Sequence, residues 1–250
     1  MGKMLPVFLV AGMGTRLSIN EPKCLIKIKE LPIILHSITA LNNLDIDIDE
    51  IVLVVGDKKN AVMNQIGNNI LGMKVNYVEN DDFHNSGTAH SLLCAKEIIL
   101  SNSIDVLMLH GDIFYDPNIF KDFIDHTEST IFVDSRYKTI TNDEMVVFGK
   151  NDLVHSIIKG PDLIKTKDNE SIILGEVLGI NLFKHDMLHG LFENLELNTQ
   201  INKEIHWEQC IETLVKYHNL EIKYFDISPL SWININYRED LETAQNLVFT

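Results

Sequence analysis

The chain contains 250 residues, of which 45% are hydrophobic and 23% are charged. This composition is typical of a folded globular protein and excludes disorder, collagen-like repeats or a disulfide scaffold as the main state. The 21 basic and 36 acidic residues leave a net charge of −15, which excludes a general attraction for nucleic acid. Any phosphate-binding function must therefore depend on a local cluster of positive charge.

The sequence shows neither a membrane span nor a secretory signal. The longest uncharged apolar runs have the length of strands, well below the roughly 18 residues that a spanning helix requires. The apolar start of the chain runs directly into a glycine turn, without a separate cleavage region. Cys24, Cys94 and Cys210 are odd in number and widely spaced, which predicts reduced thiols. We therefore expect a cytoplasmic protein with no nucleic-acid or membrane partner.

The first half alternates apolar strand-like runs with segments of helix length. The strands are rich in Val, Ile and Leu and nearly free of polar residues, as parallel strands buried on both faces are. This pattern predicts the α/β class, with a Rossmann-like, doubly wound and mostly parallel sheet that binds ligands at the carboxyl ends of its strands. The expected strands are Leu5–Ala11, Ile51–Val55, Lys74–Val78 and Ile104–Leu109, and the expected helices are Pro32–Asn43, Lys58–Asn68 and Thr88–Leu100.

From about Ile131 the runs become shorter and predict a small antiparallel extension of the sheet. No repeat, linker or shift of composition marks a boundary, so we expect a single domain over residues 1–250. The elements expected in this half are strands at Met145–Phe148, Val154–Ile158 and Ile172–Leu182, a helix at Asn202–Lys216, strands near Leu220–Phe225 and Trp232–Ile235, and a last helix from Arg238.

The first expected strand leads into a glycine-rich loop with two basic residues, Arg16 and Lys23. Glycines let backbone N–H groups approach an anion, and the two cations add the charge that neutral amides lack. The dinucleotide fingerprint fails because Leu17 replaces its last glycine, and a P-loop fails because no GK[ST] follows. The loop predicts a phosphate site of another type, with an ordinary βα turn bearing surface charges as the alternative.

The pattern GMGTR, five residues and then PKCL, directly after a first strand, resembles the sugar-nucleotidyltransferase-like family. The resemblance extends from Leu5 to about Ala244 and implies the nucleotidyltransferase (GT-A-like) fold, with a nucleotide-binding half at about 1–130 and an acceptor-binding part at about 131–236. It implies that Arg16 and Lys23 are catalytic and neutralise a triphosphate. As a loop lysine, Lys23 is expected to be exposed and to contribute little to stability. The implied nucleotide-binding residues are Leu9, Ala11, Gly12, Gly14, Thr15, Arg16, Lys23, Gly87 and Thr88.

Asp112 follows the strand in LMLHGDIFYD, where a carboxylate is a hard oxygen ligand suited to Mg²⁺. The GD pair resembles the family's metal aspartate. The segment SWININYRED resembles the family's closing W-x-E-I-D, with Asn234 and Asn236 at the acidic positions. An amide oxygen also binds Mg²⁺, so the resemblance implies a Mg²⁺ cofactor held by Asp112 and Asn236. An asparagine that only begins the next helix is the alternative for Asn236 and the preferred interpretation of Asn234.

Two further groups of residues match substrate-contacting positions of the family. The segment NSGTAHS resembles the part that reads the nucleobase through Gly87 and Thr88, although helix capping by Ser86 or Thr88 explains it equally well. Lys159, Glu176 and Arg136 are the implied acceptor-binding residues. For Lys159, an exposed lysine at a strand end is the alternative.

A phosphorylated acceptor is already an oxyanion near neutral pH, so attack on a nucleoside triphosphate requires counter-charge rather than a general base. Taken with the resemblance, the sequence predicts a Mg²⁺-dependent nucleotidyltransferase that releases pyrophosphate. It looks most similar to cytidylyltransferases that use CTP and a small phosphorylated acceptor such as phosphoglutamine or phosphocholine, for capsule polysaccharide biosynthesis. The alternatives are a uridylyl- or guanylyltransferase acting on a sugar 1-phosphate, a glycosyltransferase, and an inactive nucleotide-binding regulatory module. A homodimer is left open.

Overall fold

The computed structural model describes residues 3–123, 126–136, 144–160, 171–218 and 220–249. These residues cluster into two compact units. Unit 1 comprises Met1–His84, Ile104–His126 and Pro229–Thr250, and unit 2 comprises Asn85–Ser103 and Thr127–Ser228. The chain passes from one unit to the other after residues 84, 103, 126 and 228. The expectation of a single domain over residues 1–250 stays a prediction.

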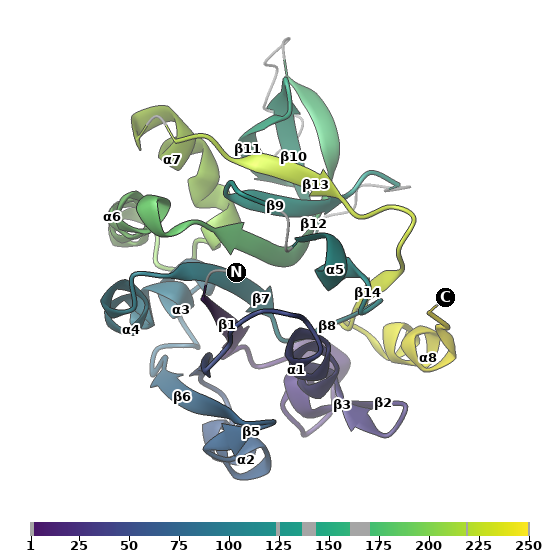
Figure 1. Ribbon diagram of the computed structural model, residues 1–250. Coiled ribbons are helices and arrows are strands. Elements are labelled where there is room, and N and C mark those ends of the chain that lie inside the picture. The colour runs from purple at the N-terminus through teal and green to yellow at the C-terminus, as the bar shows by residue number, and fades with distance from the viewer. Residues whose placement is uncertain (1–2, 124–125, 137–143, 161–170, 219, 250) are drawn as a thin grey trace. The chain divides into compact units, whose positions relative to one another are not determined.

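Unit 1 is built on a sheet with the strand order β7-β1-β4-β6-β5 (Figure 1). All but the last strand are parallel, and β5 pairs antiparallel with β6. The strands β1, β4 and β7 are almost wholly buried, because parallel strands covered on both faces require apolar side chains on both. The expected Rossmann-like, mostly parallel sheet is therefore confirmed. Its strands are β1 (Met4–Val10), β4 (Glu50–Val55), β5 (Asn69–Ile70), β6 (Met73–Glu79) and β7 (Asp105–His110).

Helices and two short strand pairs complete unit 1. The described helices are α1 (Ile33–Asn42), α2 (Lys59–Ile66), α5 (Ile119–Phe123) and α8 (Arg238–Asn246). The strand pairs are β2 (Lys27–Ile28) with β3 (Leu31–Pro32), and β8 (Ile113–Tyr115) with β14 (Trp232–Asn234). The second pair joins the segment that follows β7 to the segment that precedes α8.

Unit 2 contains the antiparallel part of the fold. Its strands follow the order β10-β11-β13-β9-β12, and a further pairing of β10 with β12 closes them into a ring. All pairs are antiparallel except β9 with β13, which is parallel. The strands are β9 (Thr130–Asp134), β10 (Met145–Lys150), β11 (Leu153–Lys159), β12 (Ile172–Phe183) and β13 (Lys223–Asp226).

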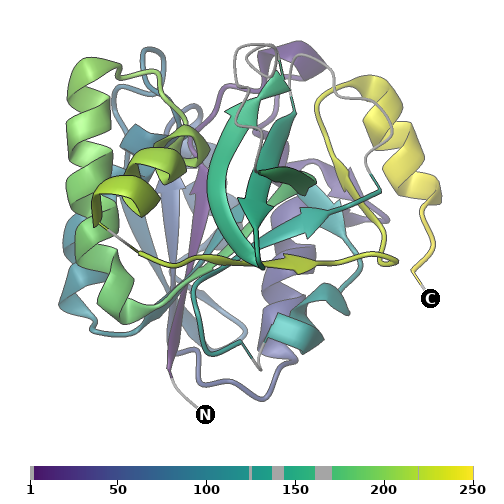
Figure 2. The ribbon, with the colours of Figure 1, turned by 90° about the horizontal axis from the view of Figure 1, so that it is seen from above.

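The described helices of unit 2 are α3 (Thr88–Cys94), α4 (Lys96–Ser101), α6 (Leu188–Ile201) and α7 (Ile211–His218). Figures 1 and 2 both show α6 and α7 side by side. None of the described helices has the length and apolar character needed to cross a bilayer.

The expected helix at Asn202–Lys216 is wrong in its first part. The structure ends α6 at Ile201, and a short 3-10 turn at Trp207–Cys210 precedes α7. The carbonyl groups of Lys203 and Ile205 accept hydrogen bonds from the backbone of Gly87 and Ala89. Because tertiary pairing occupies these carbonyls, they are not available for helical bonds.

The three cysteines are free thiols, as expected from their spacing. Burial raises the pKa of the Cys24 and Cys210 thiols to about 12, with smaller contributions from Asp112 and Glu208. Both are therefore neutral side chains that pack in the core.

Candidate active site

The carboxyl edge of the unit 1 sheet brings together three side chains that are far apart in the sequence. The Lys23 ammonium donates to Asp112 Oδ2 at 3.1 Å and to Asn236 Oδ1 at 2.9 Å. Lys23 lies in a 3-10 turn after the glycine loop, Asp112 follows β7, and Asn236 lies between β14 and α8. One cation thus joins the two oxygen donors that the sequence assigned to a metal.

The expectation that Lys23 is an exposed lysine is wrong. Its side chain is 14% exposed and that of Asp112 is 28% exposed. Ion pairs that are partly withdrawn from water are screened less than surface pairs, so removing one partner leaves a charge that is poorly compensated. Lys23 therefore contributes to the stability of unit 1 and also supplies positive charge at the candidate site.

A single hydrophobic cluster positions the backbone around these side chains. Leu17 directly follows Arg16, Ile26 follows Lys23 within the same turn, Phe114 follows Asp112, and Ile235 directly precedes Asn236. All four are buried in one cluster with Ile28, Ile33 and Ala244. The polar ends are fixed because their neighbours pack together, which is how a site is organised before a ligand arrives.

Backbone hydrogen bonds fix Asn236 further. Asp240 Oδ2 accepts from the N–H groups of Asn236 at 2.8 Å and Tyr237 at 2.7 Å, as in a capping box at the start of α8. The Ile235 N–H group donates to the Asp112 carbonyl at 2.9 Å. Sequence reasoning did not identify Asp240, although an acid at the third position of a helix was the signal for it.

The glycines of the loop have different surroundings. Gly14 has φ +61°, and a Cβ atom there would lie 2.8 Å from Lys23 Cγ and 3.4 Å from its Cδ and Cε. The lysine stem therefore lies against Gly14. No atom lies within 4 Å of a Cβ placed on Gly12, which is exposed. Gly14 serves the fold of the loop, whereas Gly12 leaves open space beside it.

We expect Gly14→Ala to destabilise the chain by about 1 to 2 kcal/mol, because it puts a side chain at a left-handed position and against the Lys23 stem. Gly12→Ala should change the free energy of unfolding by no more than about 0.5 kcal/mol. It should weaken nucleotide binding, because its methyl group projects into the open space where we expect the phosphates. Urea denaturation and calorimetric titration with CTP measure the two effects. Equal stability of the two variants would contradict this assignment.

Arg16 lies near the same segment. Its guanidinium carbon is 5.7 Å from the centre of the Tyr237 ring, within the range of a cation–π contact. Tyr237 is 45% exposed and is the first residue after Asn236. Sequence reasoning did not select Tyr237, since nothing in the loop pattern indicates a partner at the residue before α8. The two basic residues of the loop thus both contact the segment that begins α8.

The other nucleotide-site candidates of unit 1 are at the same edge. Thr15 and Arg16 are exposed, whereas Leu9 and Ala11 are buried at the end of β1. The Leu9 carbonyl accepts from Gly111 N–H at 3.2 Å, and the Ala11 carbonyl accepts from Asp57 N–H at 3.1 Å. Leu9 and Ala11 thereby tie the ends of β7 and β4 to the loop.

The chemistry of the Asp112 and Asn236 oxygens fits a magnesium ion. A carboxylate and an amide oxygen are hard donors, and both already bind one cation, the Lys23 ammonium. The described residues contain no group of three or more His, Cys, Asp or Glu side chains arranged to hold a metal. An ion held by one carboxylate and one amide would take its remaining oxygens from phosphates and water, as Mg²⁺ commonly does.

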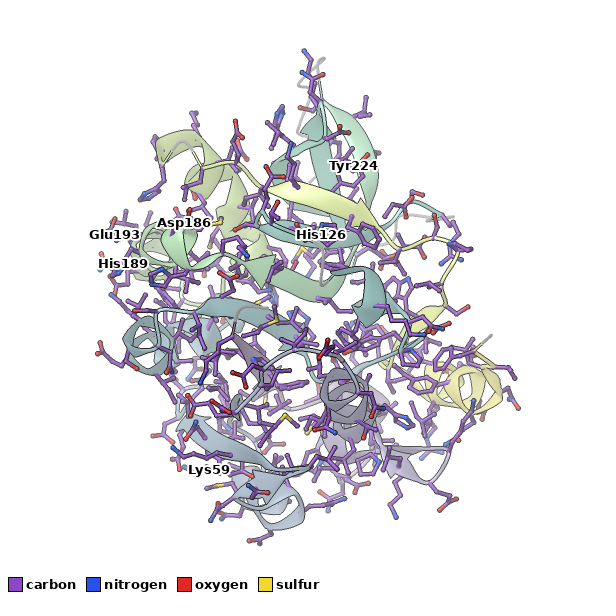
Figure 3. All side chains as sticks on the ribbon, viewed as in Figure 1. Lys59, His126, Asp186, His189, Glu193 and Tyr224 are labelled. Atoms are coloured by element: carbon purple, nitrogen blue, oxygen red, sulfur yellow. The ribbon has the colours of Figure 1, made fainter. Side chains whose placement is uncertain are left out.

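The acids and the histidine on the outer face of α6 do not form a second metal site. Asp186, in the turn before α6, and His189 and Glu193, on the helix, are all exposed (Figure 3). They are not among any metal-holding group of the described residues. This face is a solvated surface.

Gly87 and Thr88 belong to unit 2, where both contact the segment before α7. A Cβ atom on Gly87 would lie 2.1 Å from the Ile205 carbonyl oxygen. Thr88 Oγ1 accepts from Trp207 N–H at 3.1 Å and lies 3.3 Å from His206 Nδ1. The N-cap of α3 is Gly87, which makes no side-chain capping bond. Contact of Gly87 and Thr88 with a nucleobase stays a prediction.

The acceptor-site candidates are also in unit 2. Glu176 on β12 is opposite Asp134 on β9, and Asp134 binds the Arg136 guanidinium through two hydrogen bonds of 2.9 and 2.8 Å. Burial is the main cause that raises the pKa of Glu176 to about 7, and the nearby charges of Glu144 and Asp134 contribute to the same rise. Lys159 ends β11, opposite Met145. The structure thus places Glu176 and Arg136 around one carboxylate.

The raised pKa of Glu176 predicts a pH-dependent stability. Its folded value of about 7 exceeds its ordinary value of 4.5, so its contribution is fully present below pH 4.5 and is lost as pH rises through 7. Glu176→Gln should therefore stabilise the chain at pH 8 by about 2 to 3 kcal/mol and have little effect at pH 4.5. Urea denaturation across this range, with the exposed Glu193→Gln as control, measures the difference. An identical pH dependence of wild type and Glu176→Gln would contradict it.

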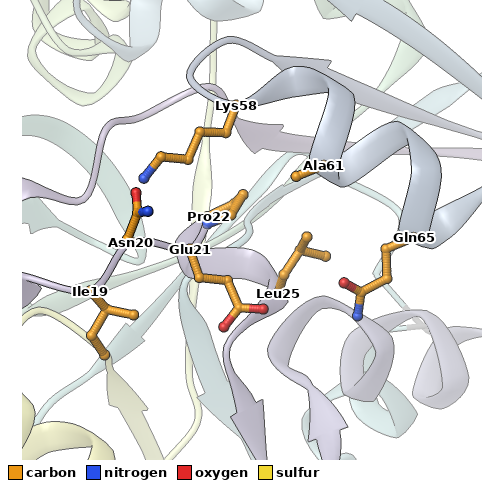
Figure 4. A pocket seen from close by; sticks show the side chains of 8 residues that line it. All are labelled: Ile19, Asn20, Glu21, Pro22, Leu25, Lys58, Ala61 and Gln65. Carbon is orange, nitrogen blue, oxygen red and sulfur yellow. The ribbon is translucent and has the colours of Figure 1, made fainter.

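Unit 1 also contains a pocket of about 670 Å³ beside the loop. Figure 4 shows the Lys58 side chain extending from the start of α2 toward Asn20 on the opposite wall. One wall is the segment that immediately precedes Lys23, so a molecule in the pocket would contact this segment. The lining residues are Ile19, Asn20, Glu21, Pro22, Leu25, Lys58, Ala61 and Gln65.

A Rossmann-like sheet with a cationic glycine loop and paired oxygen donors at its carboxyl edge defines an α/β protein with a candidate phosphate site. Residues 5–245 match the family model for nucleotidyl transferases. The chain belongs to the nucleotidyl transferase family.

Individual relatives agree with this family. A CMP-5'-(3-aminopropyl)phosphonate synthase from Streptomyces rubellomurinus is 32% identical over 52% of this chain and 20% of its own length. A CTP:phosphocholine cytidylyltransferase from Streptococcus pneumoniae has a TM-score of 0.73 at 20% identity over 98% of both chains. A putative glucose-1-phosphate thymidylyltransferase from Bacillus anthracis has a TM-score of 0.75 at 18% identity, over 99% of this chain and 97% of its own. These structures share the nucleotidyltransferase fold.

The chain spans less than two thirds of the first curated relatives that it matches, 20% of the first and 52% of the second. Other relatives are named as a uridylyltransferase from Haloferax volcanii and a guanylyltransferase subunit from Drosophila melanogaster. The family therefore establishes the class of protein, whose named members use different bases and acceptors.

Proposed function

We propose that this chain is a Mg²⁺-dependent cytidylyltransferase, which transfers CMP from CTP to a small phosphorylated metabolite and releases pyrophosphate. The observation that carries the proposal is the joining of Lys23, Asp112 and Asn236 at one sheet edge, beside a glycine loop that carries Arg16. This arrangement supplies cations and metal-binding oxygens without a nucleophilic side chain, as phosphoryl transfer between two anions requires.

The chemistry follows from charge. The acceptor phosphate is mostly a dianion at neutral pH, so it attacks the α-phosphorus without a general base. Two unit charges about 4 Å apart repel by about 4 kcal/mol at an effective dielectric constant of about 20. Arg16 and Lys23 bind the triphosphate and offset the charge of the departing pyrophosphate. When bound at Asp112 and Asn236, Mg²⁺ supplies charge neutralisation and alignment of the phosphates.

CTP is favoured among the nucleotides because two similar proteins are named for CMP or CTP chemistry, one by sequence and one by fold. Unit 2 supports an acceptor that carries both charges. Arg136 and Lys159 are suited to a phosphate, and the acids around Glu176 are suited to an ammonium group. Phosphoglutamine and phosphocholine both have this dipolar character, and capsule biosynthesis is a pathway that we propose for such a product.

The experiment is an array of four nucleoside triphosphates against a panel of phosphorylated acceptors, read by pyrophosphate release with and without Mg²⁺. The panel includes phosphoglutamine, phosphocholine, aminoethylphosphonate and glucose 1-phosphate. We expect release with CTP and a dipolar acceptor, and only with the metal. No release of pyrophosphate with any pair would contradict the proposal. A glycosyltransferase would give this result, and it would instead release a nucleoside diphosphate in a separate incubation with a nucleotide sugar.

A uridylyl- or guanylyltransferase acting on a sugar 1-phosphate is the second candidate, since relatives with these activities match the chain. The same array separates it by the nucleotide consumed. An inactive regulatory module is a third candidate, because Asn234 and Asn236 occupy positions where the family has acids. It would release no pyrophosphate in the array but would bind nucleotide in a calorimetric titration.

A further inference from the structure

We propose that Lys23 is an internal counter-ion that holds the metal position of the nucleotide-free protein, so that a divalent cation enters only when a nucleotide draws the ammonium onto its phosphates. This inference rests on the proposed function for the identity of the incoming nucleotide. It adds an order of binding at the same site. Without nucleotide the site binds a divalent ion weakly, and with a triphosphate bound it binds the ion more tightly.

The contacts of the three side chains support this exchange. Lys23 Nζ lies 3.1 Å from Asp112 Oδ2 and 2.9 Å from Asn236 Oδ1, so it binds both of the oxygens that a metal would use. Among the described residues, Asp112 has no other ion-pair partner. A metal bound to both oxygens and the ammonium between them would occupy the same space, so the two cations exclude each other.

The stem of the Lys23 side chain is packed against the loop, whereas its ammonium group can change hydrogen-bond partners by rotation about its last bonds. Its stem from Cγ to Cε lies within about 3.4 Å of the position that a Gly14 Cβ would take, so the loop backbone supports the methylene groups. The ammonium lies beyond this contact, on a bond that rotates. A rotation at the end of the side chain therefore exchanges one anion for another, without a change of the buried cluster that fixes the backbone.

The charges set the direction of the exchange. With Lys23 in place, the charges of Asp112 and Lys23 cancel, and the site offers little attraction to a free divalent ion. A bound triphosphate carries several negative charges and competes with the single Asp112 carboxylate for the lysine. Once the ammonium leaves, the two oxygens face the metal with an uncompensated charge. Metal and nucleotide are therefore expected to bind with positive coupling.

The test measures Mn²⁺ binding to the full chain without nucleotide, by isothermal titration calorimetry or by the electron paramagnetic resonance signal of free Mn²⁺. Lys23→Met keeps the apolar stem and removes the charge, and we expect it to bind Mn²⁺ at least tenfold more tightly than the wild type. Lys27→Met is the matched control, because it removes the charge of an exposed lysine on β2 in the same unit. It should leave Mn²⁺ affinity unchanged.

Two further measurements locate the effect. Adding Asp112→Asn to Lys23→Met should abolish the gain, which would place the tightened ion at this carboxylate. Lys23→Gln serves as the second variant if Lys23→Met unfolds, with folding checked by circular dichroism. CTP should increase Mn²⁺ affinity more in the wild type than in either variant, because the wild type alone has an ammonium to displace.

Unchanged or weaker Mn²⁺ binding by both Lys23 variants would overturn the exchange. So would an equal effect of CTP on the wild type and the variants. These outcomes are distinct from failure of the proposed function, because the Mn²⁺ titration requires no turnover. A chain that releases no pyrophosphate in the array yet shows the gain in Lys23→Met would retain the exchange and lose the transferase assignment.

Discussion

Replacing Lys23 by methionine is expected to lower the rate of pyrophosphate release by about a thousandfold. A unit positive charge about 4 Å from a phosphate oxygen contributes about 4 kcal/mol at an effective dielectric constant of about 20, and each 1.36 kcal/mol is tenfold in rate. Methionine preserves the stem that packs on Gly14, so the loss comes mainly from the charge. Steady-state pyrophosphate release with the best nucleotide and acceptor of the array measures it.

The same variant should lose about 1 to 3 kcal/mol of stability, because Asp112 is left partly buried without its partner. Urea denaturation separates this loss from the kinetic one. Lys27→Met should retain both activity and stability, since Lys27 is exposed and its side chain is outside the site. Turnover within tenfold of the wild type in a folded Lys23→Met protein would remove Lys23 from the catalytic machinery.

Asp112→Asn is expected to abolish Mg²⁺-dependent turnover, again by a factor of about a thousand or more. The amide keeps the size of the side chain and an oxygen, but the site loses its one carboxylate, and a hard divalent ion binds an amide much less strongly than a carboxylate. Titration of activity with Mg²⁺ should show a large rise in the metal concentration needed for half-maximal rate. Asp49→Asn is the control, because it makes the same chemical change at an exposed acid.

The opposite replacement, Asn236→Asp, gives this assignment a gain-of-function counterpart. An added carboxylate attracts a divalent ion twice as strongly as it attracts the singly charged Lys23 at the same distance, so the balance shifts toward the metal. We expect the variant to reach half its maximal rate at a lower Mg²⁺ concentration than the wild type. A metal requirement unchanged in both Asp112→Asn and Asn236→Asp would return these two positions to a structural role.

The sheet of unit 1 and its site were predictable from the sequence because strong local signals mark them. Uninterrupted apolar runs identified β1, β4 and β7, and a strand that ends in a polar residue must present it at the edge of the sheet. Lys23 and Asp112 are 89 positions apart, and Lys23 and Asn236 are 213 apart. Only the motif resemblance related such distant residues before the structure did.

Features that depend on tertiary contacts were not predictable. The burial of Lys23 results from the Gly14 backbone and Asp112, neither of which a periodic pattern reveals. The helix expected from Asn202 fails because the backbone of Lys203 pairs with Gly87, more than a hundred positions earlier in the chain. The contact of Arg16 with Tyr237 likewise joins the two ends of unit 1. Local propensity carries no information about partners this remote.

The scattered assembly of unit 1 has a consequence for biosynthesis. Leu17, Ile26, Ile28 and Ile33 leave the ribosome early, but their packing partners Ile235 and Ala244 are translated about 200 residues later. At about 5 to 20 residues per second, this delay is roughly 10 to 40 seconds. During that interval the apolar side chains next to the glycine loop lack their packing partners and stay exposed. Chaperones bind such exposed apolar surface. Codon changes that slow elongation should therefore lower the yield of soluble protein, by more than any change in the free energy of unfolding of the finished chain would explain.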